Sequence, residues 1–170
     1  GRTDSGVHAD QMFAHFDTKK IFDSDKIVSK LNSFLPNDIA VKRIFKVRED
    51  AHARFTAISR TYQYFISNKK DIFNQNLYLV FKDLNLERMN DACQNLLGEQ
   101  DFTSFSKVNT DTFTNNCDIT HAQWKHEGDN FVFTISANRF LRNMVRSIVG
   151  TLLDVGTDKI EITQIKKIIE

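Results

Sequence analysis

The chain has 170 residues, of which 41% are hydrophobic, and 23 Lys and Arg against 22 Asp and Glu give it a formal net charge of +1. This length and composition fit one globular domain with a sizeable core. No run approaches the roughly 20 apolar residues that span a bilayer, and the two cysteines lie far apart, outside any Cys-x-x-Cys motif. We therefore expect a cytoplasmic protein without disulfides or cysteine-bound metal. Any site for a polyanion must be a local patch.

The first third of the chain alternates apolar stretches with caps and turns. Residues 7–16 have strand-like content. Asp23 can cap a helix whose apolar residues recur at helical spacing until Pro36 stops it. Residues 39–47 are rich in β-branched side chains, and a long strand is predicted from about residue 55 to 67.

The remainder of the chain mixes helical and strand patterns. Asn85 can cap a helix that Gly98 ends, and a loop follows at 101–105. The later predicted elements are strands over 119–126 and 131–137 joined as a hairpin, a helix over 139–155 closed by Gly156, and a helix over 162–169. Hairpins and long strands mixed with several helices predict an α+β domain, with helices packed on a mainly antiparallel sheet.

The chain opens with an acid in a glycine-containing turn. In the string Gly1-Arg2-Thr3-Asp4-Ser5-Gly6, the glycine at position 6 can adopt a positive φ, so backbone geometry would hold the carboxylate of Asp4. Thr-Asp-Ser-Gly is also an ordinary turn sequence. The segment by itself therefore leaves Asp4 as either a turn residue or a reactive carboxylate.

Three arginines recur in the predicted helix near the other end of the chain. Arg139, Arg142 and Arg146 follow one another at three- and four-residue spacing, and no acid lies between positions 139 and 153. They form either a solvated basic face or, where they are partly buried, a site for a carboxylate or a phosphate.

Four motifs follow one another along the chain. They are residues 1–9 (GRTDSGVHA) with Gln11 shortly after, 53–55 (ARF) with 60–64 (RTYQY), 97–105 (LGEQDFTSF) and 140–150 (FLRNMVRSIVG). In this order they resemble the tRNA pseudouridine synthases of the TruA type, and the set is specific although each motif alone is weak. The resemblance covers nearly the whole chain and implies the fold of a pseudouridine synthase catalytic domain.

Carried over by position, the resemblance implies roles for four side chains. Asp4 is the essential catalytic aspartate, Arg2 helps extrude the target base, Tyr62 stacks on the uracil, and Arg146 pairs with the catalytic carboxylate. The family detaches uracil from C1′ of its ribose and rejoins it through C5 without a metal or other cofactor. An ionised carboxylate suits attack on C1′, attack on the base or abstraction of a ribose proton. From the strand pattern alone, Tyr62 is equally consistent with a core tyrosine.

Basic residues elsewhere are candidates for contact with the tRNA. The arginines expected to bind substrate besides Arg2 are Arg54, Arg60, Arg139 and Arg142, and candidates by charge and position alone are Lys19, Lys20, Lys69 and Lys70. Phe102 and Phe105 either line the pocket or belong to the core. The five histidines show no H-x-x-x-H spacing, so no metal site is predicted.

The resemblance also sets expectations for the whole molecule. It implies isomerisation of uridines at positions 38, 39 and 40 in the anticodon stem-loop of tRNA, by a homodimer. Because the family carries segments before the first motif and after the last helix, residues 1–170 are expected to be a catalytic core truncated at both ends. The activity that the resemblance implies is therefore expected of the full-length protein rather than of this core alone. Two alternatives stay open: an RNA-binding module without catalysis, and an interaction core that binds no RNA.

Overall fold

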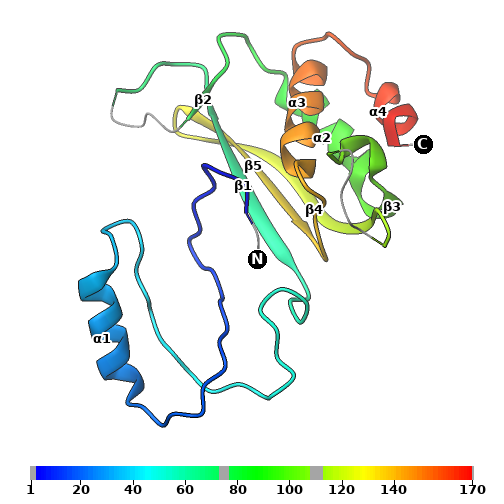
Figure 1. Ribbon diagram of the computed structural model, residues 1–170. Coiled ribbons are helices and arrows are strands. Elements are labelled where there is room, and N and C mark those ends of the chain that lie inside the picture. Colours follow the sequence, from blue (N-terminus) through cyan, green and yellow to red (C-terminus); the bar gives the residue numbers. More distant parts are fainter. Residues whose placement is uncertain (1–2, 73–76, 108–112, 170) are drawn as a thin grey trace. The chain divides into compact units, whose positions relative to one another are not determined.

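The computed structural model describes residues 3–72, 77–107 and 113–169. The chain forms two compact units, Gly1–Ala57 and Ile58–Glu170 (Figure 1). Every strand assigned within the described residues belongs to the second unit.

A five-stranded sheet lies at the centre of the Ile58–Glu170 unit (Figure 1). Its strands are β1 (Arg60–Ser67), β2 (Tyr78–Leu79), β3 (Gly98–Asp101), β4 (Asn116–Glu127) and β5 (Asn130–Ala137), in the spatial order β2-β1-β5-β4-β3. The pairing of β1 with β2 is parallel, and the other pairings among the described residues are antiparallel. The predicted α+β fold with a mainly antiparallel sheet is confirmed.

The predicted hairpin is formed by β4 and β5. Gly128, in the turn between them, has φ 60, a left-handed conformation that glycine adopts at little cost. Glu127 pairs directly with Asn130 across this turn. On its other side, β5 pairs with all eight residues of β1, so β5 is the central strand of the sheet.

Three helices of this unit pack beside the sheet and share its core (Figure 1). They are α2 (Leu86–Cys93), α3 (Met144–Gly156) and α4 (Thr163–Ile169). Their apolar stripes and the inward side chains of β4 and β5 form one core, whose largest members include Trp124, Phe102, Phe105, Phe133, Met89 and Ile148. As predicted, α2 is capped by Asn85, whose Oδ1 accepts a hydrogen bond from the backbone N–H of Arg88 at 3.0 Å.

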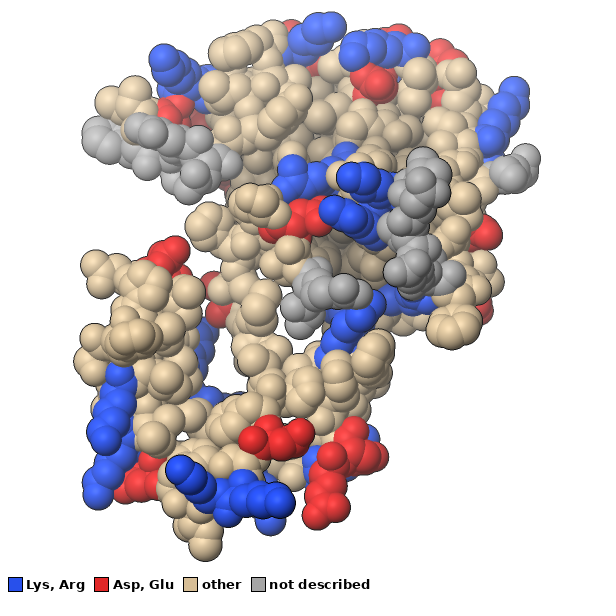
Figure 2. Space-filling model, viewed as in Figure 1, with Lys and Arg blue, Asp and Glu red and all other residues tan. Residues whose placement is uncertain are grey.

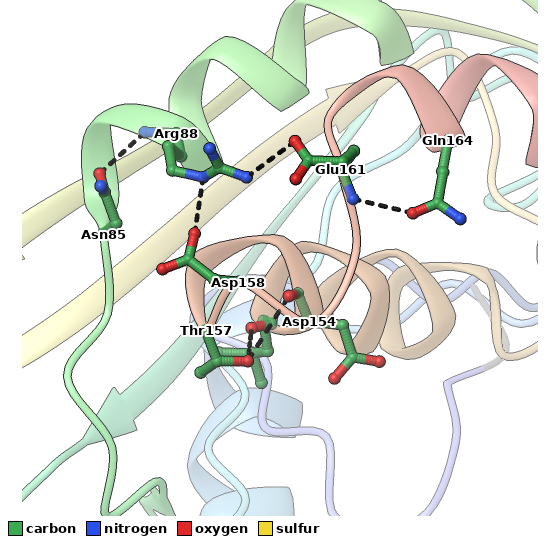
Figure 3. A network of polar contacts seen from close by, with 8 residues as sticks. Asn85, Arg88, Asp154, Thr157, Asp158, Glu161 and Gln164 are labelled. Carbon is green, nitrogen blue, oxygen red and sulfur yellow. Dashed lines mark hydrogen bonds and ion pairs between the residues drawn. The ribbon is translucent and has the colours of Figure 1, made fainter.

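Polar contacts join the start of α2 to the segment between α3 and α4 (Figure 3). The guanidinium of Arg88 contacts Asp158 Oδ1 at 3.0 Å and Glu161 Oε2 at 3.3 Å. The backbone N–H of Asn85 donates to the carbonyl of Gly156 at 3.0 Å. Because both carboxylates are largely exposed, each ion pair contributes at most about 1 kcal/mol. The contacts orient the helices more than they stabilise them.

From residue 3 onward, the described part of the Gly1–Ala57 unit contains one helix, α1 (Ser24–Phe34), and extended chain (Figure 1). As predicted, α1 is capped by Asp23, whose Oδ1 accepts from two backbone N–H groups of the first turn at 3.1 Å each. Between residues 3 and 57 no residue is buried, and large apolar side chains such as Phe16 are exposed. A local cap, rather than burial in a core, therefore defines this helix.

Four predictions about strands and loops are wrong in whole or in part. Residues 7–16 and 39–47 are not strands, because β-branched content favours a strand only where a neighbouring strand supplies backbone partners. The strand predicted from residue 55 begins at Arg60. The loop predicted at 101–105 contains a short 3-10 turn, Thr103–Phe105, directly after β3.

The helix predicted over 139–155 begins later, at Met144. Asn143 has φ 67, a left-handed conformation that cannot lie within a right-handed helix. The first two arginines of the predicted basic stripe therefore precede α3, and only Arg146 lies on it.

Candidate active site

Asp4 is the first residue of a tight turn. The backbone N–H of Val7 donates to the carbonyl of Asp4 at 3.3 Å, and Gly6 between them has φ 80, a position that favours glycine. The predicted turn is thus confirmed, and the Asp4 side chain is exposed. Arg2, expected to help extrude the base, lies outside the described residues.

Tyr62 is a half-buried residue of β1. It pairs with Ile135 of β5 and packs against the core. Its ring meets the ring of Phe140 edge-on, with centroids 5.3 Å apart and an interplanar angle of 76°. Tyr64, two residues along, meets Tyr78 in the same manner at 6.4 Å. The strand therefore presents two tyrosines at the border of the core, neither of them fully buried.

The segment between β5 and α3, residues 138–143, is referred to below as the β5–α3 connector. It carries Arg139, Phe140 and Arg142. From β1, Arg60 Nη1 donates to the carbonyl of Asn138 at 2.8 Å. Arg60 thus joins the connector to the strand that bears Tyr62.

Basic side chains gather where α3 begins. Arg139 is half-buried, whereas Arg142 and Arg146 are exposed, and Figure 2 shows a group of Lys and Arg side chains in this part of the surface. Burial raises the pKa of the Cys117 thiol, and the positive charge of Arg139 opposes that rise. Because Arg139 is half-buried, it is not part of a fully solvated basic face.

Arg54 belongs to the Gly1–Ala57 unit. Its guanidinium lies over the ring of Phe55, 5.0 Å from the centroid. Within the same turn, His52 Nδ1 accepts from the backbone N–H groups of Arg54 and Phe55 at 3.1 and 3.2 Å. This turn and residues 12–15 line an open cavity of about 460 Å³. The cavity combines a guanidinium and imidazoles with apolar side chains.

The structure separates the predicted site residues into two sets. The Ile58–Glu170 unit contains Arg60, Tyr62, Arg139, Arg142 and Arg146, on β1, the β5–α3 connector and the first turn of α3. The Gly1–Ala57 unit contains Asp4 and Arg54. The first set lies on β1 and on the chain that follows its partner strand β5. The roles of both sets stay predictions.

The structure also shows the burial and contacts of the candidate phenylalanines and lysines. Phe102 and Phe105 are buried, so the core interpretation holds for both. Lys69 forms an exposed ion pair with Asp129 at 2.9 Å. Lys19 and Lys20 are exposed, as expected of residues proposed on charge alone.

Sequence reasoning assigns no role to two residues of this region. Phe140 lies inside the fourth motif, and only its contact with Tyr62 distinguishes it from its apolar neighbours. Asn138 lies just outside that motif, and its hydrogen bonds depend on strands distant in sequence. The motif could have indicated Phe140, whereas no local pattern indicated Asn138.

Within the described ranges, no three or more His, Cys, Asp or Glu side chains are grouped so that they could hold a metal ion. Over those same ranges, no helix is both long and apolar enough to cross a membrane. Cys93 and Cys117 are free and buried.

Comparison with known proteins identifies relatives along the whole chain. The family model for tRNA pseudouridine synthase matches residues 92–170. The full chain is 55% identical to the tRNA pseudouridine synthase A of Parabacteroides distasonis, 53% to that of Bacteroides thetaiotaomicron and 39% to that of Bacillus subtilis. It covers 68%, 65% and 70% of these proteins, respectively.

The family model and the relatives place the protein among the pseudouridine synthases, which are isomerases. Its mainly antiparallel sheet with packed helices is consistent with this class. The chain belongs to the tRNA pseudouridine synthase A family. The resemblance carried by the four motifs is thereby confirmed. The chain spans about two thirds of the length of the curated relatives it matches, so family members are longer, as expected.

Proposed function

We propose that the protein isomerises uridine to pseudouridine at positions 38, 39 and 40 in the anticodon stem-loop of tRNA, and that Asp4 is its essential carboxylate. The observation that carries the proposal is 55% identity over the whole chain with a tRNA pseudouridine synthase A. The tRNA positions and the role of Asp4 follow from the motif resemblance. A cytoplasmic homodimer stays a prediction on the same basis.

The proposed chemistry needs a carboxylate held in place. The turn that begins at Asp4 provides this, because a group fixed by its backbone loses less freedom on reaching the reacting atom than one on a flexible stem. The ionised carboxylate acts either as a nucleophile or as a base. In the overall reaction the bond from C1′ to N1 breaks, a bond from C1′ to C5 forms, and the proton lost from C5 is balanced by one gained at N1.

The proposed roles of the other residues concern the flipped base and the RNA backbone. A uracil that leaves its stack needs an aromatic surface, which Tyr62 at the border of the core offers. Arg146 supplies positive charge to the reacting carboxylate. The remaining arginines proposed to contact the tRNA are Arg2, Arg54, Arg60, Arg139 and Arg142.

The proposal is tested by pseudouridine formation on an unmodified tRNA transcript. The test uses a full-length protein that contains this chain, and compares it with residues 1–170 alone, with Asp4→Asn and with Asp10→Asn, a matched change at another exposed aspartate of the same unit. We expect product at positions 38 to 40 from the protein and from Asp10→Asn, and none from Asp4→Asn. The affinity of Asp4→Asn for tRNA should stay within about twofold, because the change removes few phosphate contacts.

Other outcomes of this experiment would contradict part of the proposal or favour one of the two alternatives. Equal product from Asp4→Asn would overturn the catalytic assignment, and product only outside the anticodon stem-loop would overturn the proposed target. Salt-dependent tRNA binding without product in any form would select the RNA-binding module. Absence of both binding and product would select the interaction core.

A further inference from the structure

The first residue of the β5–α3 connector is bound to both strands that flank β5. The backbone N–H of Asn138 donates to the carbonyl of Asp118 at 3.1 Å, and Asn138 Oδ1 accepts from the backbone N–H of Asp118 at 3.0 Å. This pair of bonds, the Asn138 bracket, extends the β4–β5 ladder with a side-chain acceptor in place of a backbone carbonyl. On the opposite side, the carbonyl of Asn138 accepts from Arg60 of β1 at 2.8 Å.

The far end of the connector is held by separate contacts. The backbone N–H of Lys107 donates to the carbonyl of Arg142 at 3.0 Å. The side chain of Leu141 is only 5% exposed, and its backbone N–H contacts Met144 Sδ at 3.4 Å. The connector is therefore fixed at both ends, and the residues between have little freedom to move.

Phe140 lies between these fixed ends and is the connector's contact with Tyr62. The backbone of Tyr62 is fixed by the β1–β5 ladder, so the remaining freedom of its ring is rotation about side-chain torsions. The edge-on ring of Phe140, 5.3 Å away, limits that rotation. The position of the connector therefore decides how the Tyr62 ring is presented.

We propose that Asn138 is a positioning residue for the reaction: its bracket sets the connector, and through Phe140 the connector holds the Tyr62 ring for stacking on the extruded base. The inference rests on the proposed function. Asn138 is exposed and takes no part in the core. Truncation of its side chain therefore removes the bond from the Asp118 N–H to Oδ1 and leaves the backbone bond of the bracket in place. The change opens no cavity, so loss of packing does not mask the effect.

The test compares Asn138→Ala with Asn138→Asp, which retains an acceptor oxygen, and with Asn116→Ala, the same truncation at an exposed residue of β4. In pseudouridine formation, Asn138→Ala should lower kcat about tenfold while KM for tRNA stays within about twofold, because the reacting geometry and not tRNA affinity is affected. Asn138→Asp should recover most of the lost kcat. Asn116→Ala should behave as the unchanged protein, and the urea midpoints of all the variants should agree closely.

Hydrogen exchange of the Asp118 amide, followed by NMR, examines the bracket without reference to activity. Protection should be lost in Asn138→Ala and kept in Asn138→Asp. Three results would each overturn the inference. They are unchanged protection of the Asp118 amide in Asn138→Ala, equal losses of kcat in Asn138→Ala and Asn138→Asp, and full kcat in Asn138→Ala although protection is lost. If the full-length protein without substitutions were inactive, the proposed function would be overturned, and Asn138 would have no reaction to assist. The hydrogen-exchange result would still decide whether the bracket exists.

Discussion

Gly156 and Met89 meet where α3 packs on α2. A Cβ built at Gly156 would lie 2.7 Å from Met89 Cγ, closer than real Cβ contacts come, and Met89 is fully buried. The glycine therefore permits close approach of two helices. As the sequence predicted, α3 ends at Gly156, and a left-handed conformation follows at Asp158, with φ 57.

Two glycines of α3 provide a matched comparison of this packing. Gly156→Ala should lower the free energy of unfolding by about 1 to 3 kcal/mol, because the new methyl group must displace a buried side chain. Gly150→Ala, where a Cβ meets nothing within 4 Å, should raise it by up to about 1 kcal/mol through helix propensity. Urea unfolding followed by the fluorescence of Trp124, the only tryptophan, measures both. Equal changes in the two variants would contradict the packing role.

At the scale of an element, Asp101 organises the 3-10 turn Thr103–Phe105. Its Oδ1 accepts from the backbone N–H of Thr103 at 2.7 Å and from the hydroxyl of the same residue. The hydrogen bond from the Thr103 hydroxyl, and to a smaller extent the bond from the Thr103 backbone, hold the pKa of Asp101 below its ordinary value. The turn that they begin carries Phe105 into the core.

The stability that Asp101 contributes should depend on pH. A carboxyl whose pKa is lower in the folded state contributes stability that is fully present above its unfolded pKa of about 3.9, and this is lost as pH falls through the folded pKa. The difference in free energy of unfolding between the protein and Asp101→Asn should therefore shrink as pH is lowered from neutral into the acid range. Urea unfolding at a series of pH values measures it, with Glu99→Gln on the same strand as the control. A difference constant with pH would contradict the argument.

Elements defined by local chemistry could be predicted from the sequence. Asp23 and Asn85 cap α1 and α2 as predicted because a cap is decided by residues within one turn. The hairpin turn at Gly128 is local in the same sense. Residues 7–16 and 39–47 could not be judged in this way, because a strand depends on partners elsewhere in the chain.

The features of the candidate site likewise differ in whether they depend on local residues or on residues distant in sequence. The motifs predicted which side chains to consider, and the turn at Asp4 formed as expected because Gly6 adopts positive φ. The start of α3 and the bracket at Asn138 depend on contacts with β1, β4 and Lys107, which are distant in sequence. No periodicity within the chain encodes such contacts.

At the scale of the molecule, the two units differ in how much side-chain surface they bury. Between residues 3 and 57 no residue is buried, whereas the described part of the second unit contains an extensive core of aromatic and aliphatic side chains. Burial of apolar surface is the main source of resistance to opening. The two units should therefore differ in local stability.

Limited proteolysis with trypsin should cut the Gly1–Ala57 unit first. Exposed lysines there, such as Lys19 and Lys42, lie in chain without a core, whereas Lys125 is also exposed but lies within β4. We expect early cleavage at the first two and a longer-lived fragment that contains the second unit, identified by mass spectrometry. Cleavage at Lys125 as fast as at Lys19 would show that the sheet offers no more protection than the extended chain.

The order of strands has a consequence for synthesis on the ribosome. β4 and β5 are joined by a single turn, so this hairpin can pair as soon as both strands have emerged. β1 is made much earlier, yet all eight of its residues pair with β5. Until β5 appears, the backbone edge of β1 that pairs with β5 has no partner strand. β5 is the last of the described strands to be made, so a nascent chain in which it has not yet emerged leaves that edge open to pairing with another chain.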